Sequence, residues 1–234
     1  FSQMNISKNM PFKLVLSSLV TALILVSQGL MAQSSQGLSA EELQRNNQQP
    51  IAPKIKNFQK PVWISNQYSR QLVHKFRAQE QAILVGTKTV LDDNPTLNLR
   101  DWFGNHPVRI VLDKDLKIPQ NLAVYDKSVK TIFITDVKNV YNSSGNIFFE
   151  GIDFDQNIAI QICAILQKHH IQSVIIEGGT KTIQTFIDEN LWDEARVFES
   201  DFTYENGIKA PILNGKMISA IDVKNDTLKI YTND

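Results

Sequence analysis

From residue 51 onward, short apolar runs alternate with stretches of helical periodicity. In residues 67–80, Leu72, Val73 and Phe76 fall on one side of a predicted amphipathic helix, with charged residues elsewhere. Alternation of buried strands with helices predicts an α/β fold with parallel strand pairs. Short β-like runs near Asn214-Gly215 and Asn225-Asp226 add antiparallel strands, so the expected sheet is mixed and flanked by helices. Beyond the first helix, the pattern predicts strands at 82–86, 108–113, 131–136 and 173–179, and helices at 158–170 and 180–192.

The N-terminal part of the chain has a different pattern. Residues 14–32 are uncharged and apolar and follow Lys8 and Lys13, which is typical of a secretory signal. Ser, Thr and Gln interrupt this run, so we do not expect it to span a membrane. Residues 38–50 are polar, which predicts a linker. We therefore predict an atypical N-terminal segment at 1–50 and one globular domain at 51–234.

Composition narrows the classes of function. With 42% apolar residues among 234, the chain can bury a sizeable core. Its 24 basic and 24 acidic residues give a net charge of zero, so we expect no nucleic-acid partner. The single Cys163 excludes a disulfide framework and a multi-cysteine zinc site, and its apolar surroundings favour a core position. The four histidines have no metal-binding spacing and are predicted to lie on the surface.

A strand-to-helix junction carries the first candidate site, at Glu177-Gly178-Gly179-Thr180. Strand carboxyl ends are where α/β sheets bind ligands, and two glycines let a ligand approach the backbone at a helix start. The same residues also suit an ordinary turn, so the motif leaves phosphate binding and a structural role open.

A second candidate combines a short helical turn with two arginines. Pro95 disfavours helix at Asn94, so the turn should end there and hold Thr89 and Asp93 four residues apart on one face. These side chains could bind a nucleotide or sugar, or Asp93 could merely cap the loop. Arg77 and Arg100 could each fork onto a phosphate, although either could simply be solvated.

These motifs together resemble one protein family. WISN, the run SRQLVHKFRAQEQAILVGTKTVLDDNPTLNLR, PVRIVLD and VIIEGGTKTI look like the reductase domain of the bifunctional riboflavin-biosynthesis deaminase/reductase. The similarity runs from about Ile51 to about Leu213. It implies a dihydrofolate-reductase-like fold that uses NADPH to reduce the ribosyl group of 5-amino-6-(5-phosphoribosylamino)uracil to the ribityl form.

The resemblance also implies roles for individual residues. It places at substrate positions Pro61, Arg77, Leu97, Arg100 and Glu177. It places at nicotinamide-cofactor positions Ala32, Trp63, Thr89, Asp93, Lys114, Gly179, Thr180, Lys181, Thr182, Ile183, Gln184 and Thr185. It identifies no protein nucleophile and no metal ligand.

The N-terminus departs from the family pattern. The family's first strand reads like LKxAxSLDGxxA, and its nearest counterpart here is residues 30–37, with Leu30 in the lysine position. Either this segment is rearranged, or the first strand is built from the apolar residues 14–32. The deaminase half is absent from the sequence.

The predicted activity is therefore NADPH-dependent reduction of a small phosphorylated substrate in the cytoplasm, with a homodimer as a possible assembly. One alternative is another NADPH reductase on the same fold. The other is a non-catalytic binding protein that is exported if residues 14–32 are a working signal.

Overall fold

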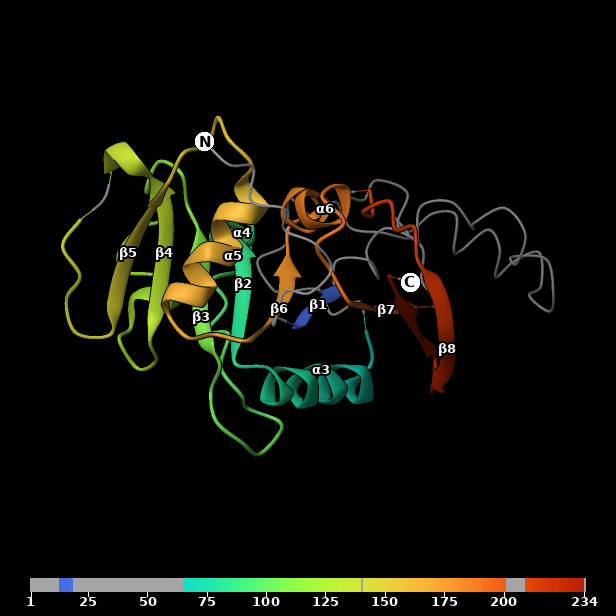
Figure 1. Ribbon diagram of the computed structural model, residues 1–234. Coiled ribbons are helices and arrows are strands. Elements are labelled where there is room, and N and C mark those ends of the chain that lie inside the picture. The colour runs from blue at the N-terminus through green and yellow to red at the C-terminus, as the bar shows by residue number, and fades with distance from the viewer. Residues whose placement is uncertain (1–12, 19–64, 140, 201–208, 234) are drawn as a thin grey trace, which may run out of the picture.

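The structure is a computed structural model that describes residues 13–18, 65–139, 141–200 and 209–233, the first of these ranges by its backbone alone. The described strands form one sheet in the order β5-β4-β3-β2-β6-β1-β7-β9-β8, which Figure 1 shows from left to right. In this order, the strands from β5 to β7 are parallel to one another, and β9 pairs in antiparallel orientation with both β7 and β8. The predicted mixed α/β sheet is confirmed.

The elements have the following bounds. The strands are β1 Lys13–Ser18, β2 Ala82–Gly86, β3 Val108–Leu112, β4 Thr131–Asp136, β5 Ile147–Ile152, β6 Ser173–Gly178, β7 Glu194–Ser200, β8 Lys216–Val223 and β9 Asp226–Thr232. The helices are α3 Gln67–Gln79, α4 Thr87–Asp93, α5 Ile158–Lys168 and α6 Thr180–Asp188, with 3-10 turns η3 Ala123–Tyr125 and η4 Val137–Asn139.

Most predicted elements are confirmed within a few residues. The strands at 82–86 and 131–136 have the predicted bounds, and α4 ends at Asp93, followed by the C-cap Asn94 at φ +42° before Pro95. Helix α6 ends at Asp188, so the predicted helix to residue 192 is too long. The pattern gave no indication of β5 or β7. Cys163 is buried in the core as expected, and burial raises the pKa of its thiol to about 11.

The sheet contains a strand from the N-terminal segment. Strand β1, residues 13–18, lies between β6 and β7 and runs parallel to both. The first strand therefore lies at the start of the apolar run 14–32, which was one of the two alternatives predicted for it. The domain boundary predicted near Ile51 and the first-strand counterpart at 30–37 lie outside the described residues, so that division stays a prediction.

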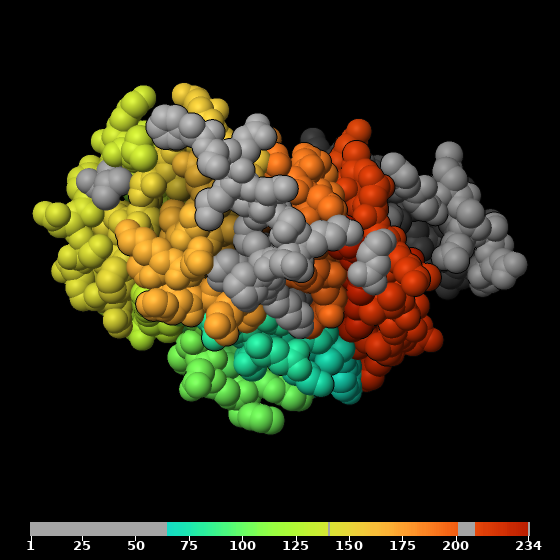
Figure 2. All heavy atoms as spheres, in the orientation of Figure 1, coloured from blue at the N-terminus to red at the C-terminus, as the bar shows by residue number. Residues whose placement is uncertain are grey.

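Both faces of the sheet are covered by helices. Alternate residues of each central strand point to opposite faces, as in Leu84 and Ile83. One core contains Leu84 with residues of α5 and α6, and the other contains Ile83 with Val73 and Phe76 of α3. In the space-filling view, α5 and α6 lie on the near side of the molecule, and α3 lies low in the view (Figure 2).

Helix α3 is fixed at its start to the far end of the sheet. The Asn66 side chain accepts hydrogen bonds from the N–H groups of Tyr68 and Ser69, which is a helix N-cap. The buried carboxylate of Asp226 accepts from the Asn66 N–H at 2.9 Å and from the Ser69 hydroxyl at 2.5 Å. These bonds set the position of α3 and hence of Arg77 in its last turn. Within the described ranges, no helix has the length and apolarity needed to cross a membrane.

Candidate active site

Two helices begin side by side at the carboxyl edge of the sheet. Strands β2 and β6 are parallel neighbours that end at Gly86 and Gly178, and α4 and α6 follow them directly. Gly179 caps α6 with φ +81°, a backbone conformation that side chains with a Cβ rarely adopt. The strand-to-helix turn predicted at Gly178-Gly179 is therefore present, and its proposed ligand remains a prediction.

The glycines of this junction make room for two threonines. A Cβ on Gly178 would lie 2.9 Å from Oγ1 of Thr89, and a Cβ on Gly86 would lie 2.6 Å from Oγ1 of Thr182. A Cβ on Gly179 would lie 3.5 and 3.6 Å from the same two hydroxyl oxygens. The structure thus brings together Thr89, Gly179 and Thr182, which come from different predicted motifs.

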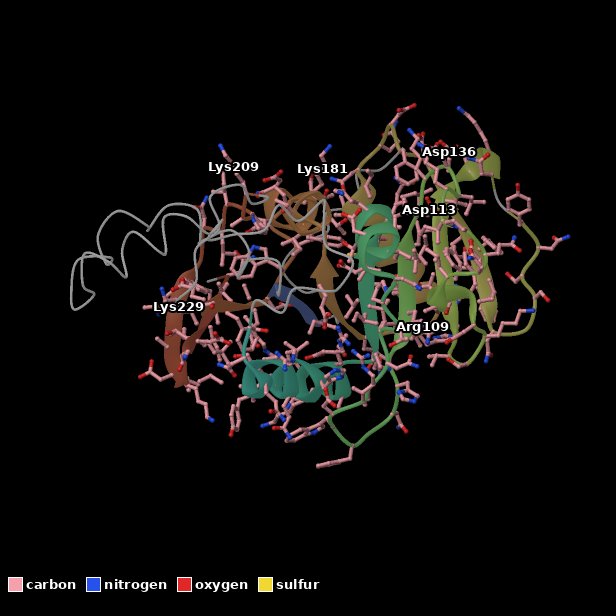
Figure 3. The ribbon with its side chains drawn as sticks, turned by 180° about the vertical axis from the view of Figure 1, so that it is seen from behind. Arg109, Asp113, Asp136, Lys181, Lys209 and Lys229 are labelled. Carbon is pink, nitrogen blue, oxygen red and sulfur yellow. The ribbon has the colours of Figure 1, made fainter. Side chains whose placement is uncertain are left out.

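Not every residue of the predicted 179–185 run is available at this junction. Ile183 is buried in the core, and Gln184 exchanges hydrogen bonds with the backbone of Ile212. The Thr180 hydroxyl donates to the carbonyl of Lys209, and the Thr185 hydroxyl donates to that of Lys181. The Lys181 side chain is exposed, and Figure 3 shows it at the same end of the molecule as Lys209.

A buried ion pair lies beside the junction. Glu177 is the last residue of β6 before Gly178, and its carboxylate accepts from Nε of Arg77 at 2.8 Å and from Nη2 at 2.5 Å. The exposed fractions are 9% for Arg77 and 6% for Glu177. Burial alone would lower the pKa of Arg77, but the charge and hydrogen bonds of Glu177 outweigh it and raise that pKa above its usual value. The structure therefore joins two residues that were predicted separately as substrate ligands.

His74 contacts the loop that carries Arg100. It lies one turn before Arg77 on α3, and its Nδ1 accepts from the Arg100 N–H at 3.4 Å while Nε2 lies 3.5 Å from the Asp101 carboxylate. Burial and the nearby Arg77 charge lower the pKa of His74. The predicted surface position of His74 is wrong, because only 5% of it is exposed.

Arg100 and Asp93 present charges to solvent. The Arg100 side chain is exposed, so its guanidinium is accessible to an anion. Asp93 is exposed at the end of α4, four residues after Thr89 as predicted. Partial removal of water by surrounding atoms, together with Asp92, raises the pKa of Asp93, and Lys88 opposes this effect.

Leu97 and Lys114, which were predicted at substrate and cofactor positions, make contacts within the fold. Leu97 is 3% exposed and adopts φ +57°, so its side chain belongs to the core. Nζ of Lys114 lies 5.2 Å from the ring of Phe154, and the Lys114 carbonyl accepts from Thr135 and Asp136. The remaining predicted positions lie outside the described residues, namely Ala32, Pro61 and Trp63.

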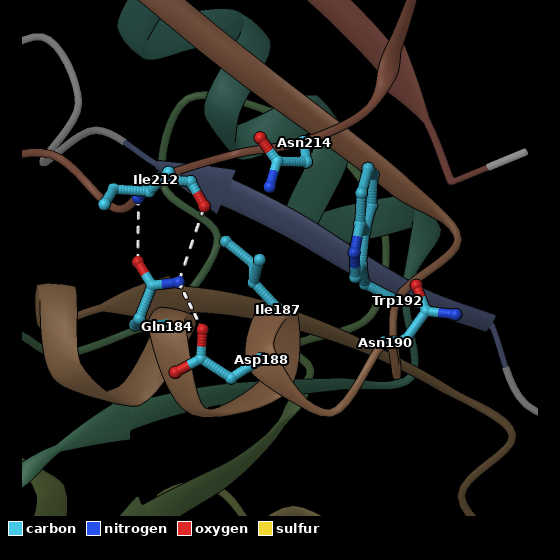
Figure 4. Close-up of a pocket in the computed structure, with 7 residues that line it drawn as sticks. All are labelled: Gln184, Ile187, Asp188, Asn190, Trp192, Ile212 and Asn214. Carbon is cyan, nitrogen blue, oxygen red and sulfur yellow. Dashed lines mark hydrogen bonds between the residues drawn. The ribbon is translucent and has the colours of Figure 1, made fainter.

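A separate pocket of about 370 Å³ lies at the C-terminal half of α6 (Figure 4). Gln184 lines it, and so do Trp192 and Ile212, but the residues of the ion pair and of the glycine junction do not. The Gln184 amide is already engaged by Ile212 and Asp188. We therefore place the candidate active site at the glycine junction and the Arg77–Glu177 pair. Among the described residues, no group of three or more His, Cys, Asp or Glu is arranged to hold a metal ion.

Comparison with known proteins gives consistent matches. The RibD C-terminal domain family matches residues 56–200. "Riboflavin biosynthesis protein RibD" of Chlamydia pneumoniae is 41% identical over 149 residues, which cover 56% of this chain and 38% of that protein. The "5-amino-6-(5-phosphoribosylamino)uracil reductase" of Buchnera aphidicola is 28% identical over 152 residues, covering 58% of this chain and 73% of that protein.

A solved structure has the same fold. The deaminase/5-amino-6-(5-phosphoribosylamino)uracil reductase of Thermotoga maritima superposes with a TM-score of 0.67 at 21% identity, covering 94% of this chain and 56% of that one. The chain spans about two-fifths of the length of the first curated relatives that it matches.

Proposed function

Because the chain belongs to the RibD C-terminal domain family, we propose that it is a pyrimidine reductase of riboflavin biosynthesis. We propose as its reaction the NADPH-dependent reduction of 5-amino-6-(5-phosphoribosylamino)uracil to the ribitylamino form. The observation that carries the proposal is the buried Arg77–Glu177 pair directly beside the glycine junction of α6. It combines a fixed carboxylate for sugar hydroxyls with a place where a cofactor can approach the backbone.

The glycine junction fits a nicotinamide dinucleotide. Side chains at Gly178 and Gly179 would fill the space beside the Thr89 and Thr182 hydroxyls, so glycine keeps the backbone N–H groups at the start of α6 accessible. Thr89, Gly179 and Thr182 would hold the cofactor here, with Lys181 near its phosphates. When bound, NADPH would supply a hydride, and the protein would align the two reactants.

The substrate would lie on the α3 side of this junction. Glu177, held by Arg77, would accept hydrogen bonds from sugar hydroxyls and orient the carbon that is reduced. Arg100 would bind the phosphate, because its guanidinium is exposed whereas that of Arg77 is committed to Glu177. A carboxylic acid or water would deliver the proton.

The test is an assay of NADPH oxidation by the full chain with the phosphoribosylaminouracil substrate. We expect turnover that requires both reactants and a ribitylamino product identified by mass spectrometry. Turnover of a dihydropterin substrate instead would favour another NADPH reductase on this fold. NADPH or substrate binding without any turnover would favour the non-catalytic binding protein.

Removing the Arg100 guanidinium should weaken substrate binding selectively. A charge-assisted bond to a phosphate contributes about 1.5–3 kcal/mol, so Arg100→Ala should raise the KM for the substrate roughly tenfold to hundredfold. The KM for NADPH should change less than twofold. Steady-state kinetics with each reactant varied in turn measures both constants, and a loss of NADPH affinity alone would contradict the assignment.

A side chain on Gly179 should impair cofactor binding. Gly179→Val combines positive φ with a β-branched residue at the proposed cofactor contact, so we expect NADPH affinity, measured by fluorescence titration, to fall about tenfold. Gly145→Val is the matched control, because Gly145 also has positive φ (+59°) but no neighbour within 4 Å of an added Cβ. Both variants should lose about 1–3 kcal/mol of unfolding free energy. Unchanged NADPH affinity in Gly179→Val would make the junction purely structural.

A further inference from the structure

The loop at residues 94–100, hereafter the 94–100 loop, has a strained backbone beside the candidate site. Leu97 adopts φ +57°, which is unusual for a large apolar residue, whereas the φ of +42° at Asn94 is ordinary for an asparagine that caps a helix. Such strain persists only where surrounding contacts enforce it, and it is concentrated at functional sites. The same loop carries Arg100, so the contacts that hold it would determine where that guanidinium lies.

Arg109 makes one of the contacts that hold the loop, and its guanidinium also bonds to residues outside the loop. It is the second residue of β3 and 0% exposed, and it lies lower in the view of Figure 3 than Lys181. Its Nη2 donates to Oδ1 of Asn98 at 2.6 Å, in the middle of the loop. Nη1 donates to Asp126 at 2.7 Å, and Nη2 also donates to Ser128 at 3.2 Å.

The charge of Arg109 is balanced by Asp126, which is not part of the loop. The Arg109 hydrogen bond lowers the pKa of Asp126 to about 2, so the carboxylate remains ionised. Asp126 in turn accepts from the N–H and hydroxyl of Ser128, which closes a small turn. Arg109 is therefore a rigid anchor, and Asn98 is the loop residue that it reaches.

Three further bonds support the same loop. The Asn94 side chain accepts from the Ala123 N–H at 2.8 Å, which ties the loop start to the segment that also contains Asp126. The Leu99 and Arg100 N–H groups donate to His106 and His74. These bonds hold the loop at its start, at Asn94, and at its end, at Leu99 and Arg100.

We infer that Arg109 is a positioning residue that acts through Asn98 to hold the 94–100 loop, and with it Arg100, in the substrate-binding arrangement. The expected change in substrate KM rests on the proposed function, whereas the hold of Arg109 on the loop does not. Neither Arg109 nor Asn98 would touch the substrate or the cofactor.

The decisive comparison is between two partners of the same guanidinium. Asn98→Ala removes the bond to the loop, and Ser128→Ala removes a bond of the same Nη2 that does not reach the loop. We expect Asn98→Ala to raise the substrate KM about tenfold with kcat and the NADPH KM within twofold, and Ser128→Ala to leave all three within twofold. Asn98→Asp keeps an oxygen acceptor for Arg109 and should return the substrate KM to within about threefold of the parent.

A second measurement does not depend on activity. Amide hydrogen exchange of the intact variants reports protection of the Leu99 and Arg100 N–H groups, which should fall about tenfold in Asn98→Ala but not in Ser128→Ala. Equal protection in the two variants, or equal KM values, would overturn the inference. If the parent chain reduces no substrate, the proposed function fails, and hydrogen exchange alone then decides whether Arg109 holds the loop.

Discussion

A form of the protein that starts at Ile51 should not fold, because it lacks the strand between β6 and β7. Residues 13–16 pair with 173–176 of β6, and residues 15–18 pair with 194–197 of β7. Without β1, two central strands would expose unpaired backbone edges in the middle of the sheet. The whole stability of a domain is only about 5–15 kcal/mol, so we expect aggregation and no cooperative unfolding transition by circular dichroism.

A point variant tests the loss of β1 pairing without removing any residues. Leu16 is in register with both Ile176 and Ala195, so Leu16→Pro removes an N–H in a central strand and should also prevent folding. Deletion of residues 1–10, which keeps Lys13–Ser18, is the control and should leave the unfolding transition intact. An Ile51-start form that folds and binds NADPH like the parent would show that β1 is dispensable.

The same strand links folding to localisation. Cleavage of a signal after Ala32 would remove β1, so we propose that export and reductase activity exclude each other, and that the active form stays in the cytoplasm, where NADPH is found. Cell fractionation of a C-terminally tagged chain, with assay of each fraction, tests this. A processed, exported form with full activity would contradict it.

Elements whose signal is local could be predicted from the sequence. Strand β2 is a continuous apolar run that ends at a glycine, and both its faces are buried, so its pattern alone fixes its bounds. The turn at Gly178-Gly179 could be predicted for the same reason, because the residues that form it are consecutive in the sequence. Strand β7 was missed because Glu194 and Arg196 break its apolar pattern, and only the structure shows that they pair with each other.

Contacts between distant segments could not be predicted in the same way. The position of β1 depends on pairing with strands far along the chain, and its apolar sequence is equally typical of a signal. Arg77 and Glu177 were each predicted as ligands, but their pairing depends on how α3 crosses the sheet. His74 is three residues before Arg77, and that helical spacing was the available signal for its buried position.

Loss of Arg77 should damage stability and activity together, because Glu177 would remain buried without its partner. Breaking a buried ion pair from one side costs about 3–5 kcal/mol, so Arg77→Ala should lower the free energy of unfolding in urea by that amount. The KM for the substrate should also rise more than the KM for NADPH, since the Glu177 carboxylate loses its fixed orientation. Lys117→Ala, which breaks an exposed ion pair with Asp115, is the matched control and should produce no measurable change.

The double variant Arg77→Met, Glu177→Leu separates the two effects. Replacing a buried ion pair by apolar side chains of similar volume is often neutral or stabilising, so unfolding free energy should return to within about 1–2 kcal/mol of the parent. Reduction of the substrate should be abolished, because no carboxylate remains to orient the sugar. NADPH affinity should be close to that of the parent, since the glycine junction is intact. A stable double variant with parental turnover would mean that the pair only supports the fold, and the substrate would then have to be oriented by other residues.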